Sequence, residues 1–154
     1  MAYDSKDDTL EHIEQVRSNL SQIVFDLVKR AEHHDRSKLG EIEKPIFDEF
    51  TPKLKDSTYG SEEYNGFLKE MGEALEHHYA VNDHHPEHFE KGIKDMNLMQ
   101  IIEMLADWYA ATMRHTDGNM YESIRINAKR FDFGEELELI FLNTANDLGW
   151  IKDA

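Results

Sequence analysis

Apolar residues recur every three or four positions over much of the chain, which is the spacing of one face of an α-helix. The longest such run predicts a helix of about eight turns over residues 9–39. Residues 40–43 break the pattern, and Pro45 is placed to begin a short helix that ends near residue 50. A polar loop is expected over residues 52–60.

Residues that commonly precede helices mark the starts of four further helices. These residues are Ser61, Asn97, Asn119 and Gly134. The helix after Ser61 places His78 on its buried side and ends at residues 82–86, because the residue before a proline avoids helical geometry. The helix over residues 98–115 is apolar nearly all round and is expected to be central. No strand alternation occurs, so the chain is predicted to be all-α, a single-domain helical bundle spanning residues 1–154.

The composition limits the possible partners. The 154 residues carry 32 acidic and 17 basic side chains, and the net charge of −15 disfavours duplex nucleic acid and anionic membranes. A small phosphorylated ligand stays compatible, because metal ions reverse the local potential. Cysteine is absent, so any metal site must use His, Asp and Glu. No apolar run approaches the ~20 residues that span a bilayer, and the acidic start is unlike a secretory signal, so a cytoplasmic location is expected.

Histidine is abundant, with nine residues, and seven of them fall into three groups. The groups are His33-His34, His77-His78 and His84-His85-His88. His34 precedes Asp35 at a helix end, where the ordinary alternative is a solvated histidine near the helix dipole. His78 and His85 are seven residues apart, and a satisfied core histidine is the alternative for His78. Three imidazoles within residues 84–88 serve no packing purpose, which favours metal or phosphate binding.

Two acids, Glu103 and Asp107, lie four residues apart on the helix over residues 98–115. Asp107 stands among uncharged residues, and a buried carboxylate there needs a partner. A salt bridge to a basic side chain is the ordinary alternative, and metal ligation is the better explanation once the histidines are counted. The predicted metal ligands are His34, Asp35, His78, His85 and Asp107, and the contested ones are His12, His77, His84 and His88.

The order of these residues resembles the HD-domain superfamily of metal-dependent phosphohydrolases. His34-Asp35-Arg36-Ser37-Lys38 is similar to the HD-x-x-K form of its phosphodiesterase branches. The run His84-His85-Pro86-Glu87, followed by Asp107, is similar to its later His-His and Asp elements. The whole chain also resembles a small uncharacterised family that is often carried by bacteriophages.

The HD-domain resemblance implies a helical bundle that holds one or two divalent metal ions (Mn, Fe, Zn, Ni, Co or Mg). It implies hydrolysis of a nucleotide or another small phosphorylated compound by a metal-activated water. The candidate catalytic residues are Asp35, Lys38 and Glu103, and the candidate substrate-binding residues are Lys38, Arg114, Arg125 and Lys129. The usual first ligand of the superfamily lies on the preceding helix, where only His12 is available. In a straight helix His12 is about 33 Å from His34, too far for the two to share an ion.

Two other functions remain open from the sequence. A di-iron oxygenase is one, because some HD-fold proteins use the same ligands for oxygen chemistry. A non-catalytic acidic helical protein, for example a phage factor that binds a host protein, is the other. A homo-oligomer is also compatible with the sequence, through an exposed aromatic end such as Trp150.

Overall fold

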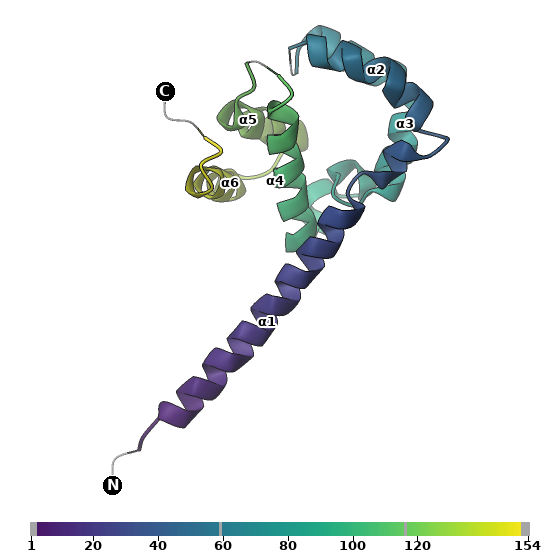
Figure 1. Cartoon of the computed structure of the whole chain (residues 1–154). Helices are drawn as coiled ribbons and strands as arrows, with labels where there is room; N and C mark the ends of the chain where they lie inside the picture. Colours follow the sequence, from purple (N-terminus) through teal and green to yellow (C-terminus); the bar gives the residue numbers. More distant parts are fainter. Residues whose placement is uncertain (1–2, 59, 116, 152–154) are drawn as a thin grey trace. The chain divides into compact units, whose positions relative to one another are not determined.

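The computed structural model describes residues 3–58, 60–115 and 117–151 (Figure 1). Within these residues the chain forms six α-helices and three short 3₁₀ helices, and no strand. The prediction of an all-α protein is therefore confirmed. The chain divides into two compact units, residues 1–34 and residues 35–154.

The first unit is built on one long helix, α1 (Lys6–His33). The helix runs without a break through residues 18–21, so His12 stays about 33 Å from the end that carries His34. None of the α1 residues is buried. The predicted continuation to residue 39 is wrong, because Asp35 adopts a left-handed backbone conformation (φ 55°) that a helix does not contain. A short 3₁₀ helix, η1 (Arg36–Leu39), follows Asp35.

The next helix, α2 (Lys44–Asp56), is longer than its sequence pattern suggested. Pro45 stands in its first turn as expected, but the helix continues through Pro52 to Asp56, so the predicted loop beginning at Pro52 is wrong. Lysine–carboxylate pairs four residues apart support this helix on both sides of the proline. They are Lys44–Asp48 (2.6 Å) and Lys53–Glu49 (2.8 Å).

Helix α3 (Glu62–Val81) begins and ends where the sequence predicts. The Ser61 side chain accepts a hydrogen bond from the Tyr64 amide (3.1 Å), which confirms the predicted cap. Gly72 interrupts the helical geometry (φ 39°, ψ −109°) and kinks the helix. The segment after the kink carries His78, which is buried on the core side as expected.

The second half of the chain contains η2 (Pro86–His88), η3 (Gly92–Asp95), α4 (Leu98–Thr112), α5 (Met120–Phe131) and α6 (Glu135–Asp147). The predicted starts of the last three helices are confirmed. Asn97 and Gln100 form a reciprocal capping box at the start of α4. Helix α4 ends at Thr112, three residues before the predicted end.

The helices of the second unit pack in two sets. In one set α2 packs on α3, and in the other α5 packs on both α4 and α6 (Figure 1). The larger buried core joins Leu105 and Trp108 of α4 to Ile124 of α5 and Phe141 of α6. Helix α4 is less enclosed than expected, because Leu98 and Ile102 are exposed. Both helix sets contribute residues to the candidate site.

Trp150 is not the exposed aromatic end that the sequence suggested as a dimer contact. Its ring stacks on Tyr109 of α4, with 4.5 Å between ring centroids and an interplanar angle of 7°. The indole is partly buried against the core. The Trp150 ring therefore packs within its own chain, against α4, and its aromatic character needs no dimer contact to explain it.

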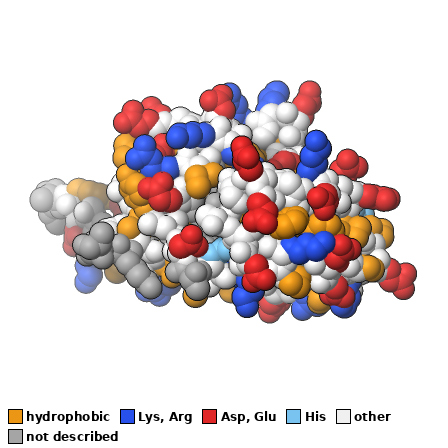
Figure 2. All heavy atoms as spheres, turned by 90° about the horizontal axis from the view of Figure 1, so that it is seen from above, with side chains coloured by type: hydrophobic (Ala, Val, Ile, Leu, Met, Phe, Trp, Pro, Cys, Tyr) orange, Lys and Arg blue, Asp and Glu red, His pale blue; other side chains and the backbone are white. Residues whose placement is uncertain are grey.

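Charged side chains cover the face that Figure 2 shows, where Asp and Glu are spread between Lys and Arg. The acidic excess on this face is dispersed rather than collected in one patch. Among the described residues, no helix has the length and apolar character needed to cross a bilayer. On the face shown, therefore, the acidic side chains do not mark a candidate site.

Candidate metal centre

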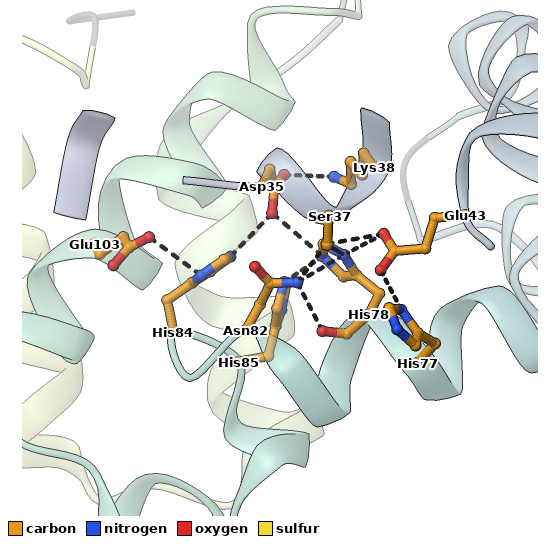
Figure 3. Close-up of polar contacts among 10 residues, drawn as sticks. All are labelled: Asp35, Ser37, Lys38, Glu43, His77, His78, Asn82, His84, His85 and Glu103. Atoms are coloured by element: carbon orange, nitrogen blue, oxygen red, sulfur yellow. Dashed lines mark hydrogen bonds and ion pairs between the residues drawn. The ribbon is translucent and has the colours of Figure 1, made fainter. Parts of the chain in front are cut away.

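Four polar side chains from three separate segments converge in the second unit (Figure 3). Asp35 precedes η1, His78 lies on the last turns of α3, and His84 and His85 follow in the next turn. One nitrogen or oxygen atom from each of these residues lies within 4.8 Å of the corresponding atom of every other. This is the spacing expected of atoms that can surround a single metal ion.

Local backbone geometry aims these side chains at one another. The left-handed conformation of Asp35 turns the chain sharply, and its carbonyl accepts a hydrogen bond from the Lys38 amide (3.0 Å). Pro86 keeps His85 extended (φ −96°, ψ 130°), because the residue before a proline avoids helical geometry. The segment after α3 therefore folds back on the end of that helix, and the His85 ring lies beside the His78 ring, with 4.8 Å between the centroids.

The distances within the cluster fit a single ion. Asp35 Oδ1 lies 3.3 Å from His78 Nε2 and 3.4 Å from His84 Nε2. Two ligand atoms at about 2.1 Å from a tetrahedral ion are about 3.4 Å apart, so these separations match. The Nε2 atoms of His78 and His85 are 2.9 Å apart, and binding of an ion between them would increase this distance by about half an ångström. The side chains of His78 and His84 are each only 2% exposed.

The ring nitrogens on the far side of two histidines contact carboxylates, of which Glu43 is buried and Glu103 is partly buried. His78 Nδ1 donates to Glu43 Oε2 (2.9 Å), and His84 Nδ1 lies 3.2 Å from Glu103 Oε1. Such a contact fixes the proton on Nδ1 and leaves the Nε2 lone pair directed at the centre of the cluster. Histidine metal ligands in proteins are usually held in this way by a carboxylate or carbonyl.

The pKa values of the cluster depart strongly from their ordinary ranges. Burial alone would raise the pKa of Asp35, but its contacts with the rings of His78 and His84 and with the ammonium of Lys38 outweigh burial and hold that pKa far below its usual value. Burial lowers the pKa of His85 to about 3, and the neighbouring His84 and His78 add to this effect. For His84 burial is outweighed by Asp35 and Glu103, which raise its pKa. Asp35 is thus ionised and His85 neutral near pH 7, as metal ligation requires, whereas the raised pKa of His84 means that an ion bound there must displace a proton.

The two acids predicted on α4 lie at the border of this cluster. Glu103 contacts His84, and a carboxylate oxygen of Asp107 lies within 4.8 Å of one from Asp35. Asp107 also affects His85, because its negative charge favours the protonated ring. The predicted juxtaposition of Asp35 and Asp107 is therefore present, although 72 positions separate them in the sequence.

A family model described as a family of unknown function, DUF5662, matches residues 1–148. The chain belongs to DUF5662. Neither the curated proteins nor the solved structures contain a match to it. The function of this DUF5662 member must therefore be argued from its own residues, and the resemblance to the HD-domain superfamily stays a prediction.

The structure separates the contested histidines of this DUF5662 member. His84 lies inside the cluster, whereas His77 Nδ1 donates to Glu43 Oε1 (2.7 Å) and His88 Nδ1 donates to the carbonyl of Tyr79 (2.9 Å). His12 lies near the start of α1 and cannot share an ion with His34. His34 is the last residue of the first unit, and its role as a ligand stays a prediction.

The predicted substrate-binding residues divide into two sets. Lys38 lies at the cluster, where its Nζ is 2.5 Å from Asp35 Oδ2. Arg114 is exposed just beyond the end of α4, seven residues after Asp107 in the sequence. Arg125 and Lys129 are exposed on α5, and Arg125 donates to the Tyr121 hydroxyl (3.1 Å). Of these four basic residues, Lys38 is the one that directly contacts a member of the cluster.

Sequence reasoning missed three polar residues of this DUF5662 member that surround His78. Glu43 is fully buried and accepts hydrogen bonds from His77, His78 and Ser37. Asn82 donates to Ser37 Oγ (2.8 Å) and to the His78 carbonyl (2.8 Å). Glu43 stands in a charged stretch with Glu41 and Lys44, and nothing in that stretch distinguishes it from a solvated acid. Only the packing of α2 on α3 shows its role.

Proposed function

We propose that this protein is a metal-dependent phosphohydrolase that acts on a small phosphorylated compound. The observation that carries the proposal is the convergence of Asp35, His78, His84 and His85, with one ligand atom from each within 4.8 Å of the others. Three imidazole nitrogens and one carboxylate oxygen suit Zn, Fe, Co, Ni or Mn better than Mg, which prefers an all-oxygen shell. One ion accounts for this cluster.

The chemistry of the proposed reaction follows from an ion held at this position. A divalent ion bound by these residues would act as a Lewis acid and lower the pKa of a coordinated water. Asp107 supplies a further carboxylate within 4.8 Å of Asp35, so it is placed to accept a proton or to bind a second ion. Glu103 contacts His84 rather than the centre, and its part is to hold that ring.

The substrate side of the proposal rests on Lys38. Its ammonium is partly exposed beside Asp35 and lies over the Phe47 ring, 4.9 Å from the centroid. An ammonium next to a bound divalent ion suits a phosphate group, which carries negative charge on several oxygens. The net charge of −15 disfavours a long polyanion and favours a small compound, whose charge the ion and Lys38 can match locally.

Metal content and phosphate release test the proposal together. The protein is purified without chelator, its metals are measured, and it is assayed with nucleoside mono- and triphosphates and with bis(p-nitrophenyl) phosphate. We expect about one bound transition metal per chain and hydrolysis that a chelator abolishes. Asp35→Asn should lose both, because it removes the only carboxylate among the four converging residues.

His88→Gln is the matched control for this experiment. His88 belongs to the same turn as His84 and His85, but it is exposed and donates to the Tyr79 carbonyl. This variant should keep the wild-type metal content and rate. A wild-type protein that binds metal and cleaves no phosphate ester would refute the proposed reaction. An iron-rich, coloured protein without phosphatase activity would point to oxygen chemistry instead.

A further inference from the structure

We infer that Glu43 is the positioning residue that prepares His78 to bind the metal, an inference that rests on the proposed metal centre. Glu43 stands just before α2, 35 residues before His78 in the sequence, yet its carboxylate is fully buried against α3 (Figure 3). A buried carboxylate is costly unless donors surround it. The donors here are two neighbouring histidines and a serine.

Each oxygen of the Glu43 carboxylate has a defined task. Oε2 accepts from His78 Nδ1 (2.9 Å) and from the Ser37 hydroxyl (3.0 Å). Oε1 accepts from His77 Nδ1 (2.7 Å). Because the carboxylate has no proton of its own to donate, it holds the His78 proton on Nδ1. The lone pair of His78 Nε2 then faces the centre of the cluster, where Asp35 Oδ1 lies 3.3 Å and His85 Nε2 2.9 Å from it.

A second layer holds Glu43 and His78 together. Ser37 lies on η1, two residues after Asp35, and Asn82 caps the end of α3. Asn82 Nδ2 donates to Ser37 Oγ (2.8 Å) and to the His78 carbonyl (2.8 Å). The segments that carry Asp35 and His78 are thereby joined through the same network that fixes the imidazole proton.

The ring on the other side of the cluster shows the same arrangement. His84 has its Nε2 directed at Asp35 and its Nδ1 at Glu103. Glu43 and Glu103 come from different parts of the chain, so the repetition is not a consequence of local sequence. Mutation of such outer carboxylates lowers metal affinity by roughly 10- to 100-fold in known metalloproteins.

The test compares zinc affinity in the full-length wild type, Glu43→Gln and His77→Gln, using competition with a chromophoric chelator. Glu43→Gln keeps the size of the side chain and removes its charge, so zinc affinity should fall roughly 10- to 100-fold. His77→Gln removes a contact to the same carboxylate without touching His78, so its affinity should stay within about twofold of the wild type.

Nitrogen NMR of the metal-free wild type gives a readout that a merely structural role would not move. The His78 ring should carry its proton on Nδ1. A proton on Nε2, or equal zinc affinity in the wild type and Glu43→Gln, would overturn the inference. A wild type that binds zinc but hydrolyses no phosphate ester would refute the proposed reaction and leave the role of Glu43 standing. A wild type that binds none of Zn, Fe, Co, Ni and Mn would overturn both.

Discussion

Lys38 and Asp35 are paired across a single turn of 3₁₀ helix, with Lys38 Nζ 2.5 Å from Asp35 Oδ2. The other oxygen of the same carboxylate, Oδ1, faces His78 and His84. Asp35 thus has one oxygen directed at the histidines and one at the lysine. Under the proposed function, this division would let an HD-x-x-K sequence hold a metal ion and a phosphate at adjacent positions, because Lys38 contacts the oxygen of Asp35 that the histidines do not.

Replacing Lys38 with Met should reduce turnover far more than metal binding. The ammonium contacts Oδ2, so its loss leaves Oδ1 and the three imidazoles in place. We expect metal content close to wild type and a fall in kcat/KM of roughly 100-fold, about 2.7 kcal/mol of transition-state stabilisation. Elemental analysis and steady-state kinetics on one preparation give both values. Loss of metal in this variant would show that Lys38 chiefly maintains Asp35 rather than holding the substrate.

Helix starts were predictable because a helix cap is a local feature. Ser61 and Asn119 each accept a hydrogen bond from the amide three residues later, which the sequence alone indicates. Helix ends were less predictable. The left-handed Asp35 ends the first helical pattern although apolar periodicity continues past it, and Pro52 lies inside α2 although prolines usually end helices.

The candidate site was predictable where spacing along one element determined it. His78 and Asp107 lie on helices in apolar surroundings, so their direction followed from helical periodicity. His84 and His85 are adjacent in a turn, where periodicity gives no direction, and both rings reach the cluster with centroids 4.1 Å apart. Glu43 depends on a contact between α2 and α3 that no local pattern encodes.

Gly72 should be intolerant of substitution although it has room for a side chain. A Cβ atom added to Gly72 would meet no atom within 4 Å, but the φ of 39° with ψ of −109° is a conformation that L-residues avoid. Gly72→Ala should therefore destabilise the fold by about 1–3 kcal/mol. Urea denaturation of the metal-free protein measures this, with Gly66→Ala as a control, since Gly66 has equal space and ordinary helical geometry. Equal stability of the two variants would show that the kink is dispensable.

Glu103 should affect metal binding through His84. Its Oε1 lies 3.2 Å from His84 Nδ1, whereas Glu76, on the exposed side of α3, provides a matched control. Glu103→Gln should weaken zinc binding by roughly 10-fold, and Glu76→Gln should leave it unchanged. If Glu103 instead took part directly in catalysis, Glu103→Gln would keep its zinc affinity and lose activity. Zinc competition and phosphate release measured side by side distinguish the two roles.

The metal-free protein should be most stable near neutral pH, and His85 and His84 should contribute to opposite sides of the maximum. Burial lowers the folded-state pKa of His85 to about 3, below its unfolded value of about 6.5, so its contribution to stability is full above pH 6.5 and is lost between about pH 6.5 and 3. His84 behaves oppositely. Asp35 and Glu103 raise its folded-state pKa, so its contribution is full below about pH 6.5 and is lost as the pH rises through the raised value.

Denaturation of chelator-treated protein from pH 4 to 9 measures both limbs of this profile. His85→Gln should flatten the acid limb, because the variant has no ring to protonate there. His84→Gln should flatten the alkaline limb for the corresponding reason. Other carboxylates also titrate below pH 5, so the contribution of each histidine is taken from the difference between the wild type and its variant. An acid limb of the same slope in His85→Gln would mean that groups outside the cluster control the stability of the protein at low pH.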